Sequence, residues 1–178
     1  MLVFVAAVVL MLIGRSRGPV AETREVVQSK ADYRIKEVHL QEEDKGARWQ
    51  LDAEYGEIFE GQGRTVMKKI TVKINARGRD WTVTGDEGEM QQATKDVQLR
   101  GNVVVMSSDG LRMETERLNW TAAEKRAWTD QPVTLRQNRG VVVRGQGFDS
   151  RFEEESAIVK GRVRATILPE AMTAAKTP

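Results

Sequence analysis

Apolar side chains recur at every second position over most of this chain. In residues 48–56, RWQLDAEYG, the residues Trp49, Leu51, Ala53 and Tyr55 alternate with polar side chains. A period of two is typical of an extended strand with one face toward water and the other toward apolar surroundings. The pattern continues from residue 32 to residue 168, where no segment has a helical period of useful length. The sequence therefore predicts an all-β domain over residues 32–168.

The alternation has an internal repeat of 30 residues. Because 30 is even, the same face stays apolar from one unit to the next. A unit of two strands cannot bury its apolar face by itself, so the units must stack. We predict a twisted two-sheet β-jelly roll, an open trough of antiparallel strand repeats. The equivalent positions are Trp81, Leu111 and Val141; Val83, Met113 and Val143; Val97, Ala127 and Ala157; and Val103, Val133 and Val163.

The two ends of such a trough are unpaired strands. The terminal candidates are residues 33–40 and 162–167. In the first, the apolar positions shift from Ile35 to Val38, as a β-bulge would allow. Unpaired strands recruit strands from other chains, so we predict partner contacts at both edges. The predicted edge residues are Tyr33, Ile35 and Glu37 at one end and Arg162, Arg164 and Thr166 at the other.

The chain begins with a contiguous apolar block, MLVFVAAVVLMLIG. It has neither the basic region nor the small-residue cleavage site of a secretory signal peptide. Its thirteen residues before Gly14 would span roughly 20 Å as a helix, short of the about 30 Å of bilayer hydrocarbon. We predict a single transmembrane anchor over residues 1–14, whose full span starts upstream, with a buried core helix as the alternative. Residues 15–31 are then a linker, and residues 169–178 a disordered tail.

Composition argues against several functional classes. Lys and Arg total 28 against 26 Asp and Glu, and the charges are interleaved, whereas a nucleic-acid-binding protein carries a basic face. The chain has no cysteine, and His39 is its one histidine, so thiolate sites and His-based triads are excluded. The glycine-rich stretches 61–64 and 144–147 lack the Lys-Ser/Thr of a phosphate-binding loop. We expect no enzyme, no cofactor and no metal; a carbohydrate-active jelly roll is the weakest alternative.

Four segments carry a resemblance to a known family: residues 31–61, LRGNVVV (99–105), LNWTAAEKRAWTDQPVTL (118–135) and residues 145–167. In these segments the chain resembles the LptC family of lipopolysaccharide export. This resemblance implies a bitopic inner-membrane protein whose periplasmic jelly roll accepts lipopolysaccharide from an ABC transporter. It also implies transfer of the lipid to a periplasmic bridge protein of similar fold, with the transporter at the N-terminal edge and the bridge protein at the C-terminal edge. The apolar block is shorter than the usual anchor of that family.

The repeated apolar phase is compatible with a lipid carrier. Shielding an acyl chain from water is worth about 0.8 kcal/mol per CH₂, so a carrier needs a continuous apolar surface. A closed sandwich core is the alternative for the same positions, in a protein that only scaffolds a membrane complex. Since the chain has no nucleotide-binding motif, we expect a partner ATPase to supply the energy. The predicted lipid-binding groove is lined by Trp49, Leu51, Val72, Ile74, Trp81, Val83, Val103, Val105, Met113, Val133, Leu135 and Val143.

Overall fold

The computed structural model describes residues 31–44, 47–76, 78–137, 140–151 and 156–167. These residues form antiparallel strands and one short 3-10 turn, which confirms the predicted all-β fold. The strands are β1 (Tyr33–Asp44), β2 (Ala47–Phe59), β3 (Arg64–Ala76), β4 (Arg79–Gln91), β5 (Val97–Ser107), β6 (Leu111–Thr121), β7 (Arg126–Thr129), β8 (Val133–Gln137), β9 (Val141–Gly145), β10 (Phe148–Arg151), β11 (Ser156–Val159) and β12 (Arg164–Ile167); the turn η1 (Glu60–Gln62) joins β2 to β3.

The predicted anchor, most of the linker and the tail lie outside the described residues. Within the described ranges, no helix is long and apolar enough to cross a bilayer.

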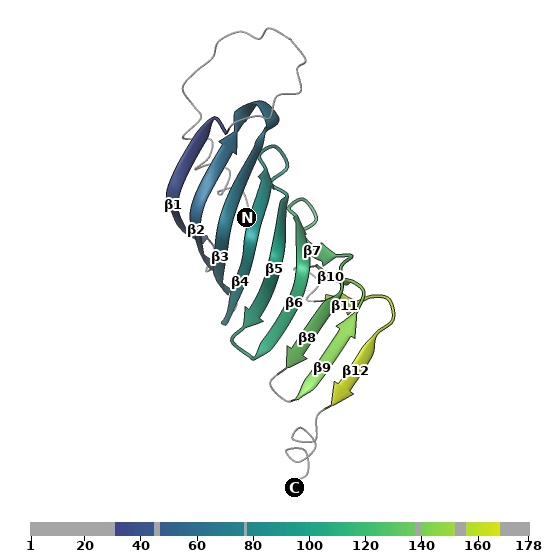
Figure 1. Ribbon diagram of the computed structural model, residues 1–178. Helices are drawn as coiled ribbons and strands as arrows, with labels where there is room; N and C mark the ends of the chain where they lie inside the picture. The colour runs from purple at the N-terminus through teal and green to yellow at the C-terminus, as the bar shows by residue number, and fades with distance from the viewer. Residues whose placement is uncertain (1–30, 45–46, 77, 138–139, 152–155, 168–178) are drawn as a thin grey trace.

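Strands β1 to β6 form a meander in which each long strand pairs with the next (Figure 1). Strand β6 then pairs with two strands, β8 along its first half and β7 along its second. The sheet therefore divides into two branches, β8–β9–β12 and β7–β10–β11. We call the half-sheet that continues into β8, β9 and β12 the first arm, and the other half-sheet the second arm.

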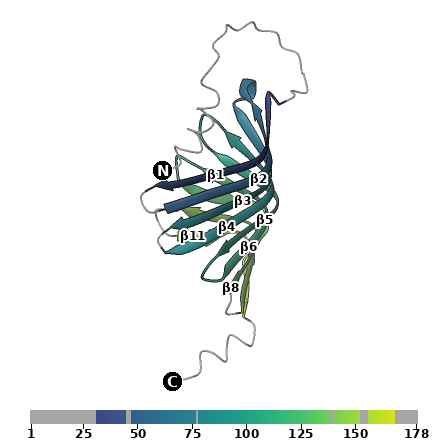
Figure 2. The same cartoon turned by 90° about the vertical axis from the view of Figure 1, so that its left-hand side faces the viewer.

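The long strands bend in mid-length, on a line across the sheet that we call the crease (Figure 2). Glu37 in β1, Lys69 in β3 and Asn102 in β5 mark this line with φ angles of 53°, 53° and 47°. Residues other than glycine rarely adopt a positive φ. Three such residues on one line therefore indicate a bend that is imposed by the packing of the arms. Beyond β6 the bend becomes a complete break, at residues 130–132 between β7 and β8 and at residues 146–147 between β9 and β10.

The prediction of a β-bulge in residues 33–40 is wrong. Pairing of β1 with β2 keeps one register from Lys36 to Val38, with no extra residue. The left-handed conformation of Glu37 shifts the side-chain phase instead. A register shift does occur in β5, between Arg100 and Val103, where Gly101 also has a positive φ of 72°.

The register confirms the repeat. Val83, Met113 and Val143 lie in one cross-strand row of the first arm, through Val105 and Leu135. Val97, Ala127 and Ala157 lie in one row of the second arm, through Trp120 and Ser150. Equivalent residues of successive units therefore stack directly, and the apolar phase runs across the whole sheet.

The core lies inside the bend, between the two arms. Ala53, Ile70, Val103 and Met113 of the first arm form one buried cluster with Met67, Leu99 and Leu118 of the second. Glycines on the inner side of the bend leave space for side chains of the opposite arm. A Cβ on Gly88 would overlap the Ile70 Cδ1 methyl group and lie 3.1 Å from Leu99 Cδ2. The corner of the trough is therefore filled by side chains.

Candidate functional site

The inner surface of the first arm carries a continuous row of apolar side chains. Its members pair from strand to strand across β2 to β9, and Ala165 of β12 extends the row opposite Val143. Of the row in β2 to β9, all residues but the buried Met113 are half-buried, and Ala165 is exposed. The row crosses the sheet at right angles to the strands, so its apolar surface is continuous along the trough. The row consists of Leu51, Val72, Val83, Val105, Met113, Leu135 and Val143.

Two tryptophans lie one row further from the crease. Trp49 and Trp81 both pair with Ile74, from β2 and β4, and all three side chains are half-buried. The guanidinium of Arg79 lies 5.6 Å from the centre of the Trp81 ring. An indole ring next to a cation suits a boundary between apolar surface and water. These two tryptophans therefore extend the apolar surface to the rim of the arm.

Three predicted lining residues are part of the core instead. Val103, Met113 and Val133 are 1%, 4% and 2% exposed, respectively. Val103 lies in the register row closest to the crease, and Met113 packs in the same buried cluster. The structure thus separates the twelve predicted residues into nine half-buried side chains and three buried ones.

The inner surface of the second arm contains residues that sequence reasoning did not assign to the site. Ile58 and Met90, on β2 and β4, are 4% and 2% exposed. Thr65 lies between them in the same row and is also buried. Their two-residue spacing was a usable signal, but it could not show which half of each bent strand remains accessible. The second arm is more deeply covered along this row than the first arm along the row of Val83.

The outer side of the crease is a charged depression of about 570 Å³, lined by residues of β2 to β5. Consecutive residues face outward here, and the pairs Lys68–Lys69 and Asp86–Glu87 belong to this lining. Asp86 accepts hydrogen bonds from the Asn102 side chain at 2.6 Å and from Lys69 at 3.1 Å. These bonds, that of Asn102 first, hold the pKa of the Asp86 carboxyl below its usual range. Hydrogen bonds between polar side chains therefore stabilise the bend on its outer side, and apolar packing stabilises it on its inner side.

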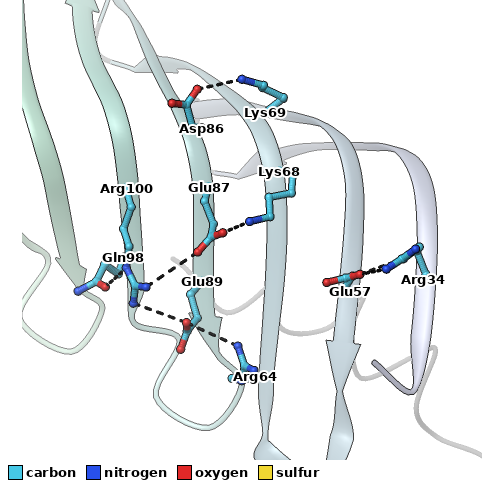
Figure 3. Close-up of polar contacts among 10 residues, drawn as sticks. All are labelled: Arg34, Glu57, Arg64, Lys68, Lys69, Asp86, Glu87, Glu89, Gln98 and Arg100. Carbon is cyan, nitrogen blue, oxygen red and sulfur yellow. Dashed lines mark hydrogen bonds and ion pairs between the residues drawn. The ribbon is translucent and has the colours of Figure 1, made fainter. Parts of the chain in front are cut away.

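Ion pairs continue from the crease over the outer surface of the second arm (Figure 3). Glu87 contacts Lys68 and lies 3.9 Å from Arg100. Glu89 lies 3.7 Å from both Arg100 and Arg64. Isolated surface ion pairs contribute about 0.2–1 kcal/mol, but a network that joins three strands limits their relative motion. The outer surface is built to stay hydrated, in contrast to the inner one.

The edges of the sheet are β1 at one end and β11 and β12 at the other. Sequence reasoning named β1 and β12 and missed β11, because the fork of the sheet has no local signature. Arg162 lies in the turn before β12, whereas Arg164 and Thr166 lie within it. Apolar side chains are exposed at all three edges: Tyr33 is 53%, Ile158 58% and Ile167 61% exposed. Within the part of the chain that the structure describes, each of these strands is paired on one side only and carries an exposed apolar side chain.

The described residues contain no group of three His, Cys, Asp or Glu side chains that could hold a metal ion. His39 Nδ1 lies 2.7 Å from Asp52 Oδ1 on the outer surface, between β1 and β2. This hydrogen bond holds the pKa of Asp52 below its usual range. His39 therefore has the cross-strand structural contact expected of a surface histidine.

The fold and the apolar inner surface define a trough-shaped antiparallel jelly roll. A family model described as Lipopolysaccharide-assembly, LptC-related matches residues 1–168, so the chain belongs to this family and takes part in lipopolysaccharide transport. No curated protein matches the sequence. Among solved structures, the fold is similar to that of LptH from Pseudomonas aeruginosa, described as the LptA homologous periplasmic component of the conserved lipopolysaccharide transport device. That likeness has 13% sequence identity and a TM-score of 0.53, and it covers 68% of this chain and 95% of LptH.

Proposed function

We propose that this chain is a membrane-anchored periplasmic carrier, which accepts lipopolysaccharide from an inner-membrane ABC transporter and passes it to a periplasmic bridge protein. One observation carries the proposal: an apolar row, half-buried except at the buried Met113, runs from Leu51 to Val143 across the trough. Shielding a long acyl chain from water is favourable by on the order of 10 kcal/mol. A continuous apolar row offers such a chain equivalent contacts at each step along the sheet.

The lipid path follows the nine half-buried side chains, and the buried Val103, Met113 and Val133 form its floor. Photo-crosslinking in cells tests this assignment. A photo-reactive residue in place of Val105, on the inner surface, is expected to capture lipopolysaccharide. The matched control is the neighbouring Val104, which has the same side chain on the opposite phase of β5; Arg100 is a second control. Equal capture from Val105 and Val104 would contradict a path on the inner surface.

A structural adaptor is the second candidate, supported by the filled corner around Val103. In an adaptor the inner side chains are only core. Val83→Asp would then unfold the domain as Val103→Asp does, by several kcal/mol, because both place an unpaired charge in the core. A carrier predicts that Val83→Asp leaves the domain folded and abolishes lipid capture at Val105. Circular dichroism in urea together with the capture assay separates the two candidates.

We propose that residues 1–14 anchor the chain in the inner membrane and that residues 15–31 link this anchor to the periplasmic domain, residues 32–168. The support is family membership and the apolar block itself. Removal of residues 1–18 should leave a soluble, folded domain. An insoluble fragment would show that the block belongs to the core.

The two ends of the trough are proposed to contact different partners. Strand β1 would face the transporter and β12 the bridge protein, which we propose has a jelly-roll fold like that of LptH. Photo-crosslinkers at Arg164 or Thr166 should trap a soluble partner, and those at Arg34 or Glu37 a membrane subunit. Exchange of the two partners would reverse this polarity. If neither edge captured a partner, Arg162 and Arg164 would only protect an exposed edge against aggregation.

A further inference from the structure

The outer surface of the first arm carries two arginines that face each other across β9 and β12. Arg144 and Arg164 are direct cross-strand partners, and both side chains are exposed. Like charges in this position destabilise a strand pair. Among the residues that the structure describes, neither arginine has an acidic partner.

Two other arginines on the same surface share one carboxylate. Arg112 donates a hydrogen bond of 2.8 Å to Glu114, and Arg136 contacts the other oxygen of the same carboxylate. These bonds hold the pKa of Glu114 below its usual range. Glu114 pairs with Thr134, which pairs with Arg144, which pairs with Arg164. Positive charge is therefore reduced by Glu114 at the start of this row, whereas no acidic side chain among the described residues offsets it at the end, where β12 is the edge.

The opposite end of the trough differs. On β1, Arg34 donates a hydrogen bond of 2.9 Å to Glu57 of the neighbouring strand, and His39 bonds to Asp52 at 2.7 Å. Glu43 lies 3.3 Å from Arg48. Arg34 and Glu43 therefore already have oppositely charged partners within the chain, so their attraction for an incoming strand is reduced. Lys36 and Glu37 of β1 form no ion pair among the described residues, but they are adjacent and carry opposite charges. An excess of unpaired positive charge is therefore a property of the β12 edge.

Strand β12 pairs with β9 on one side and has no described strand on the other. A strand added there would place one residue directly opposite Arg164, with Cβ atoms about 4.5–5.5 Å apart. Arg164 and Thr166 point to the outer phase, and Ala165 and the 61% exposed Ile167 to the apolar phase. The incoming strand must continue both phases.

We infer that the β12 edge selects a partner strand that has an Asp or Glu directly opposite Arg164 and apolar residues on the inner phase. This inference rests on the proposed handover at the C-terminal edge and specifies the partner's chemistry. The acidic side chain would complete the row from Glu114 to Arg164, in which two guanidinium groups lack a counter-charge. It would also give the handover a charge-dependent register, because a slip of one residue places an apolar side chain opposite Arg164.

Two synthetic peptides of equal length, one alternating Glu with Val and the other Lys with Val, test the inference by fluorescence anisotropy with the full chain. The Glu peptide is expected to bind at least about tenfold more tightly than the Lys peptide, and less tightly at high salt. Arg164→Glu should reverse this preference. It also creates an opposite-charge pair with Arg144, so the variant should fold at least as stably as the natural chain.

Arg117→Glu is the matched control. Arg117 is an exposed arginine on the outer surface of β6, a central strand, so its replacement changes the net charge equally without altering an edge. An equal loss of Glu-peptide binding in both variants would overturn the inference, as would equal binding of the two peptides. Phosphatidylglycerol vesicles that bind in an Arg164-dependent way, without any preference between peptides, would assign the surface to a membrane. Self-association of the chain abolished by Arg164→Glu would assign it to a second copy.

Lipid capture at Val105, measured in the same variants, separates this inference from the proposed function. Retained capture without peptide discrimination overturns the charge-selective edge and leaves the carrier function intact. Charge-selective peptide binding by a chain that captures no lipid overturns the carrier function and supports the selective edge.

Discussion

The Asp86 carboxylate accepts a hydrogen bond of 2.6 Å from the side-chain amide of Asn102, across the line where β4 and β5 bend. Asn102 adopts a φ of 47°, which asparagine tolerates better than most residues because its short side chain bonds locally. The same carboxylate binds Lys69, the positive-φ residue of β3. One acidic group thus joins two strained positions of the crease, and we expect it to control the angle between the arms.

Asp86→Ala should widen the distribution of distances between the arms. Spin labels at Lys73 and Gln91, which are exposed near opposite ends of β3 and β4, report this distance by pulsed electron resonance. Glu89→Ala is the matched control, because it removes ion pairs from the same strand away from the crease. If both variants had the distribution of the natural chain, the bend would be set by the inner packing without help from Asp86.

Gly88→Ala should destabilise the domain by about 1–3 kcal/mol, because the new methyl group meets Ile70 Cδ1 in the corner of the trough. Ile70→Val removes that atom, so the double variant should lose less stability than the sum of the single ones. Gly61→Ala is the control, since nothing lies within 4 Å of its Cβ position. Urea unfolding measures all four variants. Strict additivity would show that the two positions do not compete for the same space.

Val103→Ala and Val105→Ala should lower the free energy of unfolding by different amounts, although both replace a valine of the same strand. Val103 is 1% exposed, so its truncation leaves a cavity and should cost about 2–3 kcal/mol. Val105 is half-buried, and its truncation should cost about 1 kcal/mol. Equal losses of unfolding free energy would mean that Val105 is core rather than accessible surface.

Asp149→Asn should weaken the second arm at neutral pH and flatten its response to acid. Arg126 donates two hydrogen bonds to Asp149, at 2.6 and 2.9 Å, and Lys160 contacts it as well. These bonds, that of Arg126 first, lower the pKa of Asp149 from its ordinary 3.8. The stabilisation is therefore complete above about pH 4 and is lost as the pH falls toward the lowered pKa.

The expected loss at pH 7 is about 1–2 kcal/mol, typical of a charged hydrogen-bonded pair. The free energy of unfolding, measured between pH 7 and pH 2, should then fall less steeply for Asp149→Asn than for the natural chain. Asp130→Asn, at an exposed position, is the control for the loss of one charge. If the free energy of unfolding fell equally steeply with decreasing pH for the natural chain and for Asp149→Asn, the assigned role of Asp149 would be contradicted.

Alternation and the 30-residue repeat were sufficient to predict the strands, the trough and two of its edges. They worked because side chains of a strand alternate strictly between faces, and an even repeat preserves that alternation from unit to unit. Val83, Met113 and Val143 could therefore be assigned to one row before any pairing was known. Membership of the LptC-related family confirms the resemblance noted in the sequence.

The crease could not be predicted in the same way. Lysine has no preference for positive φ, and Lys69 adopts it because the arms must close over Ile70 and Met67. A signal did exist, since the adjacent charged residues Lys68–Lys69 and Asp86–Glu87 interrupt the alternation where the strands bend. Read as interruptions of strands, these pairs indicate nothing about the direction or the angle of a bend.

The sequence by itself determined which face of each strand is apolar, because that depends only on the period of two. The tertiary structure decided how deep each apolar side chain lies. Val103 and Val105 share a strand, a face and a side chain, yet the first is buried beside the crease and the second, two residues away, is half-exposed. Val103 lies next to the bend that brings the arms together, whereas Ile58 and Met90 of the second arm are buried far from it. Depth therefore depends on contacts between strands far apart in the chain, which the period of two does not specify.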